Sequence, residues 1–226
     1  MKNIRIKTIT IAGIFLIAGA LSLAFATGKS EPMDEMNQET KIDISFEGAE
    51  TAVFAGGCFW GVEGVFERLK GVANVESGYA GGSADTAHYK IVGTGTTGHA
   101  ESVRILYDPN YISYETLLEV FFSVAHDPTQ YNYQGPDVGT EYRSAVFYLN
   151  DKQKEETEKY IMELENKDVY KQPIVTEVAA LDEFYPAEDY HQDFMRLNPT
   201  HPYIEYWDVP KVKDLEKKFP ELITKK

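Results

Sequence analysis

The stretch TAVFAGGCFWGVEGVFERLKG, residues 51–71, has the clearest structural pattern in the chain. Its first five residues are apolar or β-branched and predict a short strand, which the pair Gly56-Gly57 ends. From residue 58 to residue 70 apolar side chains recur at helical spacing, at Phe59, Val62, Val65, Phe66 and Leu69. Gly71 is a helix stop, so the unit is strand, glycine turn and helix, with a cysteine on the first helical turn.

The chain after residue 71 continues to alternate strands and helices. Alternating or apolar runs predict strands at 72–79, 100–107, 144–149 and 175–181, and amphipathic runs predict helices at 113–122, 151–166 and 212–219. The polar or proline-containing segments 83–99, 126–141 and 185–210 are predicted as loops. Two strands are adjacent in sequence, so the pattern favours an α+β fold, a two-layer α/β sandwich with a mixed sheet, in one domain over residues 50–226.

The first 26 residues have the pattern of a secretory signal. Three basic residues precede the uncharged apolar run Thr8–Phe25, and Ala24-Phe25-Ala26 has the small residues that a signal peptidase accepts. We expect cleavage after Ala26 and export to the periplasm or the cell exterior. If the segment is retained, it anchors the chain in a membrane with the domain outside. Residues 27–49 are acidic, lack periodicity and predict a flexible linker.

Composition excludes several classes of protein. The 226 residues include 22 basic and 36 acidic side chains, a net charge of −14, which argues against a nucleic-acid partner. The chain has one cysteine, so it forms no intramolecular disulfide and no multi-cysteine zinc site. Its five histidines lack zinc-like spacing, and we expect no metal.

Cys58 is the residue that most needs an explanation. At the start of a helix, backbone N–H groups and the helix dipole stabilise a thiolate, which predicts a nucleophile. The adjacent Phe59 and Trp60 would then form an apolar pocket suited to a methyl or thioether group. Two alternatives remain open: an inert buried cysteine, and a thiol hydrolase or acyltransferase in which His99 or His191 is the base.

Polar residues at the ends of two predicted loops are candidate partners of the cysteine. Glu101 begins the strand at 100–107, where burial would raise its pKa and let it hold a proton at neutral pH. Asp137 and Tyr142 lie in a polar turn before the strand at 144–149. They either form a hydrogen-bonding cluster at the site or stabilise the turn.

Four stretches together resemble one known family. GGCFWGVE at 56–63, TGHAE at 97–101, QGPDVGTEYRS at 134–144 and FYPAEDYHQ at 184–192 are similar in order and spacing to the A-type peptide methionine sulfoxide reductases. The resemblance covers about residues 50–210.

The resemblance implies a role for seven side chains. Cys58 matches the nucleophile, and Glu101 matches the acid that protonates the sulfoxide oxygen. Tyr89 matches a tyrosine that binds this oxygen. The other matches are the cage for the substrate S-methyl group, Phe59 and Trp60, and the remaining polar members of the site, Asp137 and Tyr142.

The resemblance also implies a fold, an activity and partners. The fold is related to the ferredoxin-like type, and the reaction reduces methionine-S-sulfoxide, free or in oxidised proteins, without a bound cofactor. Cys58 would become a sulfenic acid. Many relatives carry resolving cysteines, whereas this chain has none, so an external thiol must reduce Cys58: a thioredoxin-like protein or a small thiol. We expect a monomer.

Overall fold

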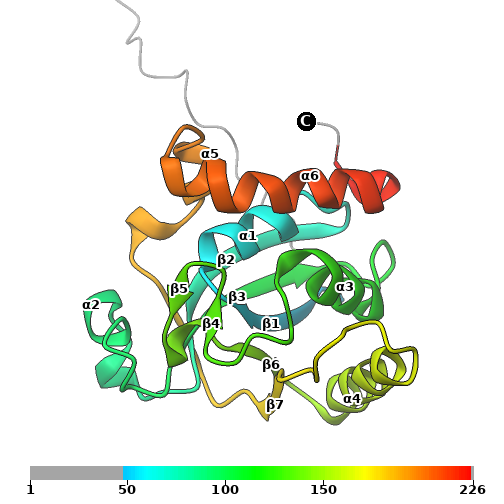
Figure 1. Ribbon diagram of the computed structural model, residues 1–226, viewed down its shortest axis with the longest axis horizontal. Helices are drawn as coiled ribbons and strands as arrows, with labels where there is room; N and C mark the ends of the chain where they lie inside the picture. Colours follow the sequence, from blue (N-terminus) through cyan, green and yellow to red (C-terminus); the bar gives the residue numbers. More distant parts are fainter. Residues whose placement is uncertain (1–47, 225–226) are drawn as a thin grey trace, which may run out of the picture. The chain divides into compact units, whose positions relative to one another are not determined.

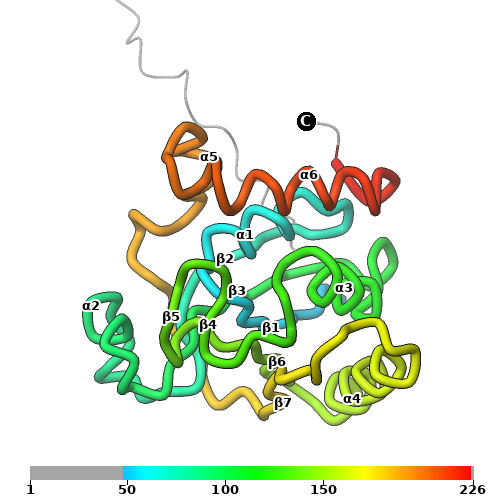
Figure 2. Tube along the Cα trace, viewed as in Figure 1, coloured from blue at the N-terminus to red at the C-terminus, as the bar shows by residue number. Residues whose placement is uncertain are grey.

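A six-stranded sheet forms the centre of the computed structural model, which describes residues 48–224 (Figures 1 and 2). The strand order is β7-β6-β1-β3-β2-β8, and β6 and β7 are parallel whereas the other neighbours are antiparallel. The bounds are β1 (Glu50–Gly56), β2 (Val72–Ala80), β3 (Ala100–Tyr107), β6 (Ser144–Tyr148), β7 (Glu177–Ala180) and β8 (Phe184–Pro186). The predicted α+β class and mixed sheet are confirmed. The predicted signal (1–26) and all but the end of the linker (27–49) lie outside the described residues.

Alternation along β1 divides the core between the two faces of the sheet. Ala52 and Phe54 belong to the larger cluster, which they share with α1 (Phe59–Phe66) and α3 (Tyr114–Val120). Val53 and Ala55 belong to a smaller cluster on the opposite face. Helix α4 (Asp151–Asn166) packs against α3, β6 and β7, and α6 (Val209–Lys218) lies along α1 (Figure 1). None of the helices within residues 48–224 is long and apolar enough to cross a membrane.

The predicted loops contain short elements that have no periodic signal. Helix α2 (Tyr89–Val92) and the 3-10 turn η1 (Ala84–Thr86) lie between β2 and β3. A small hairpin, β4 (Tyr133–Gln134) and β5 (Asp137–Val138), precedes the 3-10 turn η3 (Thr140–Tyr142). The segment 185–210, predicted as a loop, holds part of β8 and further short helices: η4 (Asp189–His191), α5 (Phe194–Leu197) and η5 (Ile204–Asp208). Such short elements depend on tertiary contacts, which sequence periodicity does not report.

Helix boundaries also differ from the predictions. Helix α1 ends at Phe66, four residues early, and α3 passes into the π-helical segment η2 (Phe121–Ala125). The last helix begins at Val209 instead of residue 212, because Pro210 suits a first helical turn. The 3-10 turn η6 (Pro220–Leu222) follows it.

A side-chain amide attaches the segment after β8 to the sheet. The Gln192 Oε1 atom accepts the backbone N–H of Ser77 at 2.9 Å, and its Nε2 donates to the carbonyl oxygens of Ser77 and Ala187, both at 2.9 Å. The amide thus continues the hydrogen-bonding pattern of β2 beyond β8. This attachment places residues 188–212 next to the start of α1, where the site lies.

Candidate active site

Cys58 occupies the turn between β1 and α1. It is the residue immediately before the helix, with φ −52° and ψ 122°, one position earlier than its predicted place on the first turn. Gly57 has φ +86°, which favours glycine, and a Cβ there would lie 2.5 Å from the Gln134 side chain of the hairpin. The glycine therefore allows the hairpin to close over the cysteine.

The surroundings of Cys58 favour the thiol over the thiolate in the free protein. The residue is 8% exposed. Burial raises the pKa of the Cys58 thiol well above its usual value, and the charges of Glu101 and Asp208 add to this. The Trp60 N–H and Lys211 act in the opposite direction. The expectation of a thiolate stabilised by the helix start is therefore wrong, because burial, with Glu101 and Asp208 acting in the same direction, outweighs one N–H group and one ammonium.

Glu101 is the carboxyl group next to the cysteine. It is 3% exposed on β3, and its Oε2 accepts the backbone N–H of Phe59 at 3.1 Å. Burial raises the pKa of Glu101 to about 8, and nearby Asp137 and Glu141 also raise it. Most Glu101 side chains therefore carry a proton at pH 7. The predicted burial and raised pKa are confirmed.

Two tyrosines from different segments lie near Glu101 and Cys58. The backbone N–H of Tyr89, the first residue of α2, donates to Glu188 Oε1 at 3.1 Å. Burial, then Glu101 and then Cys58 raise the pKa of Tyr89 to about 12. Tyr142, at the end of η3, has its pKa raised by burial, Glu101 and Asp137. Both phenols keep their protons at neutral pH and can donate hydrogen bonds to an anionic or polar oxygen.

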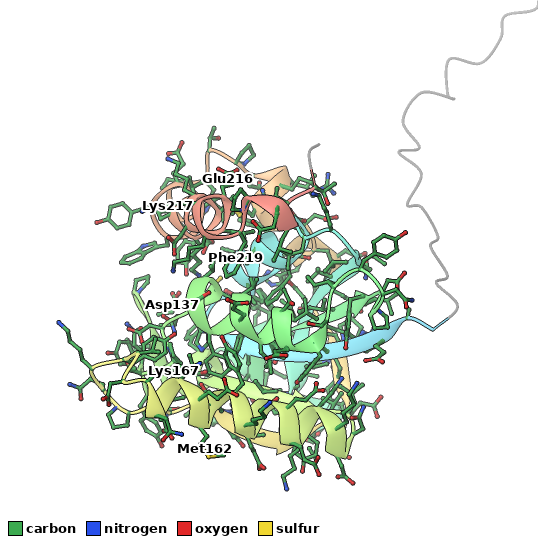
Figure 3. All side chains as sticks on the ribbon, turned by 90° about the vertical axis from the view of Figure 1, so that its right-hand side faces the viewer. Asp137, Met162, Lys167, Glu216, Lys217 and Phe219 are labelled. Carbon is green, nitrogen blue, oxygen red and sulfur yellow. The ribbon has the colours of Figure 1, made fainter. Side chains whose placement is uncertain are left out.

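Asp137 lies on strand β5 of the hairpin and is labelled in Figure 3. Its cross-strand partner is Gln134, whose side-chain amide exchanges two 3.1 Å hydrogen bonds with the backbone of Asp127. Burial raises the pKa of Asp137, whereas a hydrogen bond from the Tyr203 hydroxyl to Oδ2 and the charge of Lys211 lower it.

Tyr203 is a site residue that the sequence analysis missed. Besides donating to Asp137, its ring lies edge-on to Trp60, with centroids 5.9 Å apart and an interplanar angle of 84°. Burial and the charge of Cys58 raise the pKa of its phenol. It lies in the aperiodic segment 185–210, where the only available signal was the high density of aromatic residues.

An aromatic wall, which we define as Trp60, His191, Phe194 and Tyr203, continues from the helix start. The Trp60 indole N–H donates to His191 Nδ1 at 3.1 Å, and its ring stacks on Phe194 at 3.8 Å and 10°. His191 is 1% exposed, and burial lowers its pKa, so the ring is neutral. The Phe59 ring lies 5.0 Å from His191. Trp60 and Phe59 therefore have fixed orientations beside Cys58.

The alternative of a cysteine–histidine pair finds no support in this geometry. The His99 ring nitrogens contact the Gly82 N–H at 3.2 Å and the Ser83 carbonyl at 3.0 Å. His191 Nδ1 is occupied by Trp60. Within residues 48–224 no hydrogen bond joins a histidine to Cys58, and no group of three His, Cys, Asp or Glu side chains is arranged to hold a metal ion.

Residues 50–223 match the family described as peptide methionine sulfoxide reductase. The chain belongs to this family. It is 58% identical over 179 residues to a peptide methionine sulfoxide reductase MsrA of Mesorhizobium japonicum, covering 79% of this chain and 92% of the relative. A second MsrA relative, from Synechocystis, is 47% identical over 208 residues, which cover 89% and 97% of the two chains. The activity is that of a peptide-methionine (S)-S-oxide reductase.

Two solved structures agree with the fold. The methionine sulfoxide reductase A of Corynebacterium diphtheriae aligns with a TM-score of 0.61 at 34% identity, over 70% of this chain and 78% of that one. Mxr1 from Saccharomyces cerevisiae in its reduced form aligns with a TM-score of 0.63 at 34% identity, over 68% and 88% of the two chains. The mixed sheet and its helices are therefore those of a methionine sulfoxide reductase.

Proposed function

We propose that Cys58 is the nucleophile and Glu101 the acid of this sulfoxide reductase. The observation that carries the proposal is a buried carboxyl group, protonated at neutral pH, that is held at the first N–H of the helix beginning beside the only cysteine. A sulfoxide sulfur becomes electrophilic when its oxygen is protonated or strongly hydrogen-bonded. Glu101 supplies the proton, and Tyr89 and Tyr142 supply further donors for the same oxygen.

In the net reaction the substrate sulfur loses one oxygen atom and Cys58 gains one. The Cys58 sulfur attacks the substrate sulfur and forms an S–S bond, while the S–O bond breaks and the protonated oxygen leaves as water. Water then attacks the Cys58 sulfur, the S–S bond breaks, and methionine leaves. The substrate sulfur gains two electrons, and Cys58 loses two and becomes a sulfenic acid. The leaving water takes one proton from the thiol and one from Glu101, and the attacking water returns one proton to Glu101.

The substrate methyl group is assigned to Phe59 and Trp60. The aromatic wall holds Trp60 through one hydrogen bond and one stacked ring, so its apolar face needs no reorganisation when the substrate binds. Asp137 accepts a hydrogen bond from the Tyr203 hydroxyl and so helps to fix another member of the aromatic wall. An apolar fit of one methyl group contributes about 1–3 kcal/mol to discrimination.

An external thiol closes the cycle. Two thiol groups reduce the sulfenic acid: the first forms a mixed disulfide with Cys58 and releases water, and the second releases Cys58 and forms a disulfide. A thioredoxin-like protein supplies both thiols from one molecule, whereas a small thiol reacts twice. We assign the reaction to an exported protein on the basis of the segment Met1–Ala26. Fractionation of cells that express the full chain tests this, because recovery of an uncleaved protein in the cytoplasm would refute it.

Mass spectrometry of Cys58 tests the proposed chemistry. The full chain is mixed with one equivalent of a blocked methionine-S-sulfoxide, without reductant, and with dimedone to trap sulfenic acid. We expect one methionine product per protein and a dimedone adduct on Cys58. Product formation without modification of Cys58 would refute the assignment. The R epimer of the same compound is the control and should give neither product.

A further inference from the structure

An ion pair lies beneath the first turn of α1, outside the set of residues that the family resemblance names. Asp208, the last residue of η5, is fully buried, and the Lys211 ammonium on α6 lies 3.1 Å from its Oδ1. The two residues are three apart, so both lie on the same side of α6. The Lys211 side chain is 19% exposed.

Gly61 shows how closely this pair approaches the start of α1. A Cβ at Gly61 would lie 2.0 Å from Asp208 Oδ1 and 2.8 Å from Lys211 Nζ. Any side chain at position 61 would displace the pair. Gly61 is three residues after Cys58, so its Cα faces the same side of the helix as the cysteine. The ion pair therefore packs against the turn that carries the proposed nucleophile.

The charges around Cys58 come from several elements. Glu101 on β3 and Asp208 on η5 oppose ionisation of the thiol, and Lys211 on α6 favours it. A negative charge on Cys58 raises the pKa of three phenols: Tyr89 on α2, Tyr142 on η3 and Tyr203 just before η5. The charge of Lys211 also lowers the pKa of Asp137. Lys211 thus offsets the carboxylates of an acidic site.

We propose that Lys211 and Asp208 are positioning residues that set the charge of Cys58 with opposite signs, Lys211 stabilising its thiolate and Asp208 opposing it. The inference rests on Cys58 as the nucleophile of the proposed function. The thiolate is needed twice: for attack on the sulfoxide, and as the leaving group when the second external thiol cleaves the mixed disulfide. A thiol leaves faster when its thiolate is more stable.

The rate of Cys58 alkylation by iodoacetamide between pH 6 and pH 10 tests this in the full chain. Lys211→Met should slow alkylation about 3- to 10-fold at pH 7.5 and move the pH profile to higher pH. Asp208→Asn should move the profile to lower pH, and Lys211→Arg should largely preserve it. Lys217→Met is the matched control, because Lys217 is on the same helix but exposed (Figure 3), and it should leave the profile unchanged.

Opposite shifts by Lys211→Met and Asp208→Asn support the proposal, since damage to packing would move both variants alike. Equal slowing by Lys211→Met at every pH, or shifts of the same sign, would overturn it. If Lys211→Met does not fold, comparing Asp208→Asn with Asp208→Asn/Lys211→Met isolates the ammonium, and equal profiles would overturn the proposal. Alkylation involves no sulfoxide, so a failure of the proposed function appears separately, as a lack of methionine product from the wild-type protein.

Discussion

The β1–α1 junction and the segment from residue 184 to residue 212 contribute to the same site in different ways. The junction is a regular strand and helix, and it presents Cys58 and Phe59 through local geometry alone. The later segment consists of short elements and the start of α6, and it supplies three members of the aromatic wall and the buried Asp208–Lys211 pair. The reacting group is therefore placed by local structure, whereas its environment is assembled by distant residues.

The largest expected effect comes from the junction. Cys58→Ser should abolish reduction of methionine-S-sulfoxide with dithiothreitol as reductant, because a hydroxyl cannot be oxidised as the thiol is. The replacement is nearly isosteric at a position that is 8% exposed, so the variant should fold. Residual turnover above that of the buffer would show that the nucleophile lies elsewhere.

Glu101→Gln should have the next largest effect. In single turnover at pH 7 the rate of sulfoxide reduction should fall on the order of 100-fold, because the amide holds the Phe59 N–H but donates no acidic proton. Alkylation of Cys58 by iodoacetamide should not fall with it, since Glu101 opposes thiolate formation. Equal slowing of both reactions would mean that Glu101 acts on the thiol instead of the substrate.

His191→Phe tests how the segment from residue 184 to residue 212 helps to orient Trp60. The ring volume is kept but the acceptor for the Trp60 indole N–H is lost, so the indole is less firmly oriented. We expect KM for a blocked methionine sulfoxide to rise about 3- to 10-fold while kcat changes less than about threefold. His88→Phe, at an exposed histidine, is the control. An equal fall in kcat would place His191 in the chemical step.

Glu63→Gln tests a hydrogen bond that joins α1 to the segment from residue 184 to residue 212. Glu63 on α1 is 2% exposed, and its Oε1 accepts the backbone N–H of Asp193 at 3.1 Å. Burial raises the pKa of Glu63 to about 8 from 4.5, so the folded protein keeps a proton that the unfolded chain has already released between these pH values. The contribution of Glu63 to the free energy of unfolding therefore falls as pH rises from about 4.5 to 8.

Urea denaturation at pH 5 and pH 8 measures this contribution. Removing the titrating group should make the loss of stability smaller in Glu63→Gln than in wild type, by about 2–4 kcal/mol. Sulfoxide reduction at pH 7 should change less than twofold. If the two proteins lose the same stability between these pH values, Glu63 is ionised in the folded state and the stated burial effect is wrong.

Features that depend on neighbours along the chain could be predicted from the sequence. The strand, the Gly56-Gly57 turn, the helix and the position of Cys58 follow from period and glycine placement, and the raised pKa of Glu101 follows from its place at the start of a buried strand. The single cysteine already required an external thiol.

The environment of the thiol, in contrast, depends on the tertiary structure. The helix start suggested a thiolate, but burial together with Glu101 and Asp208 reverses that preference, and Asp208 is 150 residues further along the chain. His191, Phe194, Tyr203 and Lys211 lie where no periodicity marks them as partners of Cys58. Helices and strands can be predicted because their hydrogen bonds follow from the spacing of residues close together in the sequence. The desolvation of an atom and the charges around it depend on side chains that are distant in the sequence and meet only in the folded chain.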